Sequence, residues 1–154
     1  LAALEHVPRG ARLVSFVGKQ CRQPWAMERI DHLPAMALVR REAFSNDQWT
    51  MAGAQLLDVH YPEGGRFVRD PSQMTTAEKC PLERWLTLDD ALKRFPRAAF
   101  DYVWLIDPPA YDPMAVEGLR PIWRNGASVL YKVERGDRIA TSDTPTGSGT
   151  RPTR

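Results

Sequence analysis

The sequence predicts an α/β fold: one domain with a layered sheet of about five strands, mixed or mostly parallel, and short flanking helices. Three observations support this prediction. The run "FDYVWLI" at 100–106 is apolar throughout and of strand length, which is typical of a central strand buried on both faces. Strand-like and helix-like segments alternate along the chain. Its 154 residues, 43% of them apolar and 26% charged, fit a single domain with its own core.

The remaining strands are predicted from shorter patterns. Apolar runs rich in β-branched and aromatic residues, or alternation of apolar and polar residues, predict strands at 11–18, 35–44, 54–61 and 127–134. The segment 62–81 contains Gly64, Gly65, Pro71 and Pro81 and is predicted to be a long connection. A connection of this length is typically functional or disordered.

Two helix starts are predicted from capping residues. Thr87 is a suitable N-cap for a helix over 87–96, and Asp90 follows it at the spacing of a capping box. Apolar residues then recur at helical spacing, and Pro96 ends the segment. Asp112 before Pro113 predicts a second, short helix, because proline is favoured at the first helical position.

The ends of the chain differ from its body. Residues 1–10 are predicted to be the last turns of a helix, 11–134 the domain and 135–154 a flexible tail. The tail has four arginines and two aspartates, which accounts for the whole net charge of +2, so a nucleic-acid partner is not expected. No apolar run reaches 18 residues. Because the chain starts at Leu1 inside a helix-like phrase, we expect a fragment of a longer protein.

Asp107 is the first candidate for catalysis, because ligands of open α/β sheets bind beyond the carboxyl ends of strands. The simpler interpretation is that Asp107 only ends the strand before Pro108 and Pro109. His32 is the second candidate, since an imidazole beside Asp31 could be oriented by it. No nucleophile lies near His32 in sequence. Asp112 is a possible binding residue, although a helix cap explains it more simply.

A binding role is also considered for the loop "SNDQW" at 45–49. Its amide and carboxylate groups, on Asn46 and Asp47, could bond sugar hydroxyls while Trp49 stacks on a ring. Such clusters more commonly form turns through bonds between side chains and backbone.

Cysteine and motif content limit the remaining chemistry. Cys21 and Cys80 would be ordinary thiols in a reducing compartment and could form a disulfide in an oxidising one. There is no CxxC and no cluster of histidine and cysteine, so no metal site is predicted. The sequence also has no GxGxxG, GxxxxGK[ST], GxSxG or HExxH motif, and no cofactor is expected.

Four phrases together resemble a known kind of domain: "LAALEHVPRGARLVSFVG", "DHLPAMALVRREAFSNDQW", "AFDYVWLIDPPAYDP" and "PIWRNGASVLYKV". They are similar to the soluble C-terminal region of bacterial polytopic membrane proteins that resemble GT-C integral-membrane glycosyltransferases, which use lipid-linked sugars. The resemblance covers about 1–134.

The resemblance implies an extracytoplasmic, periplasmic domain whose partners are the membrane portion of its parent and a glycan or lipid-linked sugar. Catalytic acids of that architecture lie in loops between membrane helices, so no catalytic residue is carried over. The resemblance also implies a Cys21–Cys80 disulfide. The function expected is a non-catalytic accessory domain. The alternatives are a protein-interaction module that uses 62–81 and Trp85, and a stand-alone enzyme with Asp107 as its acid or base.

Overall fold

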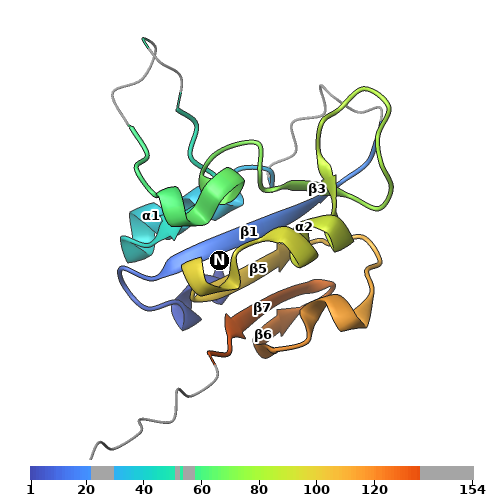
Figure 1. The fold of residues 1–154 in the computed structure, drawn as a ribbon. Helices are drawn as coiled ribbons and strands as arrows, with labels where there is room; N and C mark the ends of the chain where they lie inside the picture. The colour runs from blue at the N-terminus through green and yellow to red at the C-terminus, as the bar shows by residue number, and fades with distance from the viewer. Residues whose placement is uncertain (22–29, 51–52, 54–57, 136–154) are drawn as a thin grey trace, which may run out of the picture.

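A computed structural model of the chain describes residues 1–21, 30–50, 53 and 58–135 (Figure 1). The tail predicted at 135–154, apart from Arg135, and half of the strand predicted at 54–61 lie outside these residues. The strands are β1 (Arg12–Lys19), β2 (Phe44–Ser45), β3 (Met74–Thr76), β4 (Leu86–Thr87), β5 (Tyr102–Ile106), β6 (Leu119–Asn125) and β7 (Ser128–Val133). The α-helices are α1 (Met36–Arg41) and α2 (Leu88–Arg94). The 3₁₀ helices are η1 (Ala2–His6), η2 (Leu33–Ala35), η3 (Pro62–Val68), η4 (Arg97–Ala99) and η5 (Pro113–Val116).

All seven strands join one mixed sheet, which confirms the predicted α/β class. The strand order is β4-β3-β1-β5-β7-β6, and β2 also pairs with β1. The pairs among β1 to β5 are parallel, whereas β7 is antiparallel to both β5 and β6. The parallel half therefore continues into an antiparallel hairpin, as Figure 1 shows for β5, β7 and β6.

Each face of the sheet is covered by its own apolar cluster. Val103 and Leu105 of β5 point into a cluster that includes α2 and Phe67 of η3. The alternate residues, Tyr102, Trp104 and Ile106, point into a second cluster with η1 and Ala37 of α1. All five residues of β5 are buried, so the prediction of a central strand covered on both faces is confirmed.

The N-terminal helical turn is part of the second cluster. Ala3, Leu4 and Val7 are at most 1% exposed, so η1 packs on the sheet. In the described part of the chain, no helix combines the length and the apolar composition needed to cross a bilayer.

The strand predicted at 35–44 is wrong. Met36–Arg41 is α1, and only Phe44–Ser45 is strand. Methionine, alanine, leucine and arginine are strong helix formers, and here they outweigh the β-branched Val39. Leu38 and Val39 are 45% and 75% exposed, so these apolar residues lie at the surface and are not buried in the sheet.

Other differences concern short strands. Of the strand predicted at 54–61, the described residues 58–61 are not strand. The strands β3, β4 and β6 were not predicted, because each is short or carries exposed polar residues. The long connection at 62–81 is ordered through η3 and β3.

The helix predicted at 87–96 is confirmed as α2. The Asp90 N–H donates to the Thr87 hydroxyl oxygen at 3.2 Å, which is the predicted N-cap. The short helix after Asp112 is confirmed as η5. There the Met114 N–H donates to the Asp112 carboxylate at 2.9 Å.

One edge of β1 is paired by two separate strands. β2 pairs with Arg12 and Leu13, near the start of β1, and β3 pairs with Val17 to Lys19, near its end. Residues 46–48, which follow β2, and 70–73, which precede β3, lie between the two. We call these two segments the strand break. It lies on the side of β1 that faces away from β5.

Candidate functional site

In the strand break no described strand pairs with the middle of β1 on this side. The Asn46 side chain makes the hydrogen bonds to β1 that a strand would otherwise make. The Ser15 N–H donates to Asn46 Oδ1 at 2.8 Å, and Asn46 Nδ2 donates back to the Ser15 carbonyl at 3.0 Å. Asn46 Nδ2 also donates to the Ser72 hydroxyl at 3.2 Å, which links the two segments of the break. Asn46 is fully buried, so it satisfies the backbone of β1 and is not available to a ligand.

Asp47, the next residue, is a buried carboxylate with three partners. Its side chain is 3% exposed. Oδ1 lies 2.9 Å from His32 Nδ1 and accepts from Gln73 Nε2 at 3.2 Å, while Oδ2 accepts from the Ala35 N–H at 3.0 Å. The first helical turn after His32 and the start of β3 therefore converge on the carboxylate that follows β2.

Asp70 and Gln73 complete the cluster from the other segment. Gln73 Nε2 donates to Asp70 Oδ1 at 2.5 Å as well as to Asp47. Gln73 is fully buried, and its Oε1 has no hydrogen-bond partner. Ligand atoms of His32, Asp47 and Asp70 all lie within 4.8 Å of one another. We call His32, Asp47, Asp70 and Gln73 the break cluster.

The charges of the break cluster shift two pKa values. The hydrogen bond to Asp47 raises the pKa of His32, against an opposing effect of burial, and the nearby charges of Asp47, Asp70 and Asp31 raise it further. Burial raises the pKa of Asp47, although the bond to His32 opposes this effect. The surroundings of His32 are therefore anionic and favour a positive charge at its position.

The predicted loop at 45–49 divides into buried and exposed residues. Asn46, Asp47 and Gln48 are at most 8% exposed, whereas the Trp49 residue is 60% exposed. The His32 side chain is 51% exposed and forms the solvent edge of the cluster. The exposed Trp49 indole gives a stacking surface, and the half-exposed His32 imidazole, held by Asp47, gives a hydrogen-bonding group. This arrangement can bind a polar ligand or a cation.

Asp107 lies elsewhere, at the carboxyl end of β5. It is exposed and has a φ of 43°, and its N–H donates to the Ser128 hydroxyl at 3.0 Å. It lies in a hollow of about 440 Å³ whose lining residues are mostly apolar, among them Trp104 and Trp123. A Cβ at Gly18 would lie 2.0 Å from the Asp107 carbonyl oxygen, so the turn after β5 packs tightly on the end of β1.

If Asp107 were a catalytic acid or base, we would expect His32, Asp47 or Asp112 beside it. None of these three is among the described residues that line the Asp107 hollow. His32 and Asp47 pair with each other instead. Asp112 caps η5, and its backbone N–H donates to the Asp89 carboxylate at 2.9 Å.

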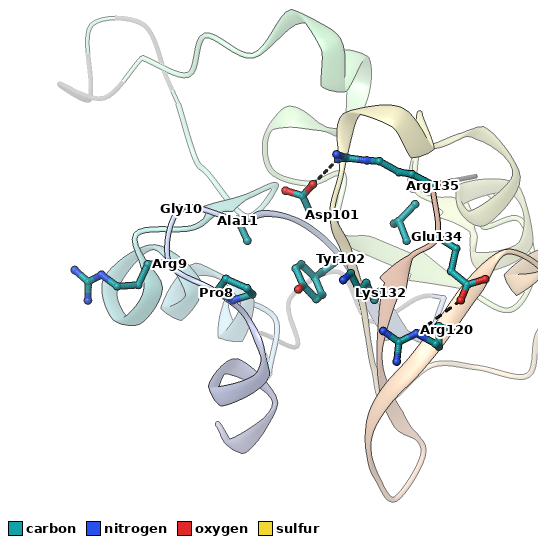
Figure 2. A pocket seen from close by; sticks show the side chains of 11 residues that line it. Pro8, Arg9, Gly10, Ala11, Asp101, Tyr102, Arg120, Lys132, Glu134 and Arg135 are labelled. Carbon is teal, nitrogen blue, oxygen red and sulfur yellow. Dashed lines mark hydrogen bonds and ion pairs between the residues drawn. The ribbon is translucent and has the colours of Figure 1, made fainter. Parts of the chain in front are cut away.

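A larger hollow lies at the opposite end of the sheet and has a volume of about 890 Å³ (Figure 2). Four of its charged groups form two pairs, Arg135 with Asp101 and Arg120 with Glu134 at 3.7 Å, which are dashed in Figure 2. The arginine and glutamate side chains in these pairs are all more than half exposed. This hollow holds no residue that the sequence singled out, so the break cluster is the stronger candidate.

The two cysteines form a disulfide, with their Cα atoms 5.4 Å apart. Cys21 follows the end of β1, and Cys80 follows the end of β3. The bond therefore joins the carboxyl ends of two neighbouring strands and closes the stretch of chain that contains the whole break cluster.

Sequence reasoning missed Asp70 and Gln73. Both lie in the segment predicted to be a long connection, and neither belongs to a motif or a periodic pattern. The expectation of no metal site rested on the spacing of histidine and cysteine along the chain. The break cluster takes its ligand atoms from three separate segments, which spacing does not reveal.

Comparison with known proteins adds no relative. No protein-family model matches the chain, and neither a curated protein nor a solved structure is significantly similar to it.

Proposed function

We propose that the chain is a non-catalytic accessory domain of a membrane-embedded, glycosyltransferase-like protein. In this role it contacts an acceptor glycan or a lipid-linked sugar through the surface formed by Trp49 and the break cluster. The observation that carries the proposal is the half-exposed His32 imidazole bonded to Asp47, with the exposed Trp49 two residues further along the chain from Asp47.

The chemistry of this surface suits a carbohydrate. Sugar hydroxyls bond to carboxylates and imidazoles, and the apolar face of a sugar ring packs on an indole. His32 is half-exposed and bonded to Asp47, so it is an oriented donor at the edge of the site. The domain does not need to supply an acid or a nucleophile for this role.

One further observation supports the extracytoplasmic location. The Cys21–Cys80 disulfide is of a kind that persists in oxidising compartments such as the bacterial periplasm. The proposal also includes a membrane portion of the parent protein, which we expect to be encoded upstream of Leu1. The sequence of that reading frame tests this expectation. A parent without membrane-spanning helices would remove this part of the proposal.

Glycan binding is tested on the folded chain by saturation-transfer NMR with neutral and acidic oligosaccharides and a polyprenyl-phosphate sugar in detergent. We expect contacts at the Trp49 indole and loss of the signal in Trp49→Ala. Leu82→Ala is the matched control, because Leu82 is 81% exposed and follows the disulfide rather than the break cluster. Wild-type binding by Trp49→Ala, or no binding by the wild type, would contradict the proposal.

The interaction-module alternative has weaker support. A hollow of about 350 Å³ beside Trp85 is lined by three arginines, one aspartate and apolar residues such as Phe67 and Met74. Its lining therefore mixes positive charge with apolar groups, whereas docking of an apolar partner would favour a continuous exposed apolar patch.

A further inference from the structure

We propose that His32, Asp47 and Asp70 bind a divalent transition-metal ion, of which Zn²⁺ is the best match. Gln73 supplies a fourth ligand through its side-chain oxygen. This site goes beyond the proposed glycan contact and does not depend on it.

The geometry is close to that of a zinc site. Two ligand atoms at ordinary zinc distances and a tetrahedral angle lie about 3.3 Å apart. His32 Nδ1 and Asp47 Oδ1 are 2.9 Å apart, and the three ligand atoms lie within 4.8 Å of one another. A zinc ion would fit among them once the wider separations, which are at most 4.8 Å, close toward 3.3 Å.

Gln73 is the residue that would complete the ligand set. Its Nε2 donates to two carboxylates, while its Oε1 is buried and has no partner. Rotating the amide by 180° about its last side-chain bond exchanges the two atoms. Oε1 then faces Asp47 and Asp70, and a cation bound between the three oxygens takes the place of the two hydrogen bonds that Nε2 gives up.

The donor set indicates the class of metal. One imidazole and two carboxylates suit Zn²⁺ or Mn²⁺, whereas Mg²⁺ and Ca²⁺ favour oxygen ligands alone. The Ala35 N–H holds Asp47 Oδ2 and so fixes the orientation of the carboxylate, as groups around metal ligands commonly do. The His32 side chain, 51% exposed, leaves a route from solvent to the site.

The site is also built on fixed backbone. Asp47 follows β2 by two residues, and Gln73 immediately precedes β3. The Gln73 carbonyl accepts from the Val17 N–H at 2.7 Å, so β1 holds both segments in register. A ligand set anchored in this way is arranged before the metal arrives.

The test is calorimetric titration of ZnCl₂ into the chelator-treated, dialysed chain with its disulfide intact. MgCl₂ is titrated in parallel. We expect one Zn²⁺ per chain and no measurable heat with Mg²⁺. His32→Ala and Asp70→Asn should weaken zinc binding by about tenfold or more. His60→Ala and Asp107→Asn, which remove an exposed imidazole and an exposed carboxylate elsewhere, should bind as the wild type does.

Gln73→Glu gives a test in the opposite direction. It places a third carboxylate where Oε1 is proposed to bind, so we expect tighter zinc binding than in the wild type. A purely structural role for Gln73 predicts no gain in zinc affinity. Circular dichroism confirms that each variant is folded before titration.

Two results would overturn the zinc site. The first is the absence of saturable one-to-one binding by the folded wild type. The second is wild-type affinity in both His32→Ala and Asp70→Asn, because Zn²⁺ would then bind elsewhere. Trp49→Ala separates the two proposals, since it removes the glycan contact and should leave zinc affinity unchanged.

Discussion

Two regions of this sheet are stabilised in different ways. In the hairpin half, formed by β5, β6 and β7, the buried residues are apolar and alternate between two clusters. The strand break and the elements joined to it contain all ten buried polar or charged residues of the described chain: Ser15, Lys19, Asp31, Ser45, Asn46, Asp47, Gln48, Gln73, Thr75 and Thr76.

The difference separates a scaffold from a site. Burial of apolar strands is non-directional and tolerates repacking, so the hairpin half needs only the right pattern of side chains. A buried polar group must find a partner of the right geometry, and a network of such groups holds one arrangement. The strand break therefore has fixed side-chain positions, which binding requires, but little apolar burial of its own.

We expect the largest loss of stability from removal of the disulfide, and its distribution over the sheet tests the difference between the two regions. Replacing both cysteines by serine opens a 59-residue separation, which lowers the free energy of unfolding by about 4 kcal/mol in the chain-entropy model. We expect hydrogen exchange at β3 to accelerate more than at β5, because the bond closes the stretch that contains the strand break. Denaturant unfolding measures the total loss. Equal acceleration in both strands would contradict the division into two regions.

The next largest loss of stability is expected from a substitution in the hairpin half. Leu105→Ala removes a fully buried side chain from the centre of β5 and should cost about 3 kcal/mol through lost burial and a cavity. Val39→Ala, at a residue that is 75% exposed, should change stability by less than about 0.5 kcal/mol. Chemical denaturation of both variants measures the difference. A small loss for Leu105→Ala would show that apolar burial is not what stabilises this half.

The same division explains what the sequence could predict. β1, β5, β7, α2 and the Asp112 cap have local signals: apolar runs, helical spacing and capping residues. The strand break has none, because Asn46 replaces a strand through bonds to Ser15, 31 residues away. Asp47 and His32 were predicted as separate candidates. Their pairing and the contribution of Asp70 and Gln73 depend on tertiary structure.

A third prediction tests the replacement of a strand by a side chain. Asn46→Ala leaves the Ser15 N–H and carbonyl without their partners in a buried setting, which should cost about 2 kcal/mol. Asn46→Asp keeps an acceptor for the Ser15 N–H but loses the donor and buries a charge, so it should not restore stability. Thermal unfolding and exchange at Ser15 measure both variants. Stability equal to wild type in Asn46→Ala would show that the break needs no such bridge.

The smallest loss of stability is expected from removal of the ion pair between Asp101, which precedes β5, and Arg12 of β1. Asp101 accepts from the Arg12 N–H at 2.9 Å and from Arg12 Nε at 3.0 Å. Burial opposes ionisation of Asp101, but the bonds and the charge of Arg12 outweigh it and lower its pKa. Both side chains are about a third exposed, so Asp101→Asn should cost only about 1 kcal/mol at neutral pH.

The pH dependence of that cost identifies its origin. Because the Asp101 pKa is lower in the folded chain, its stabilisation is fully present above the ordinary value of 3.8 and is lost as the pH falls through the folded value. The difference in unfolding free energy between wild type and Asp101→Asn should therefore shrink below pH 4 and vanish at lower pH. Denaturant titrations from pH 2 to 7 measure it. A difference that persists at pH 2 would mean that the charge of Asp101 is not the source of the stabilisation.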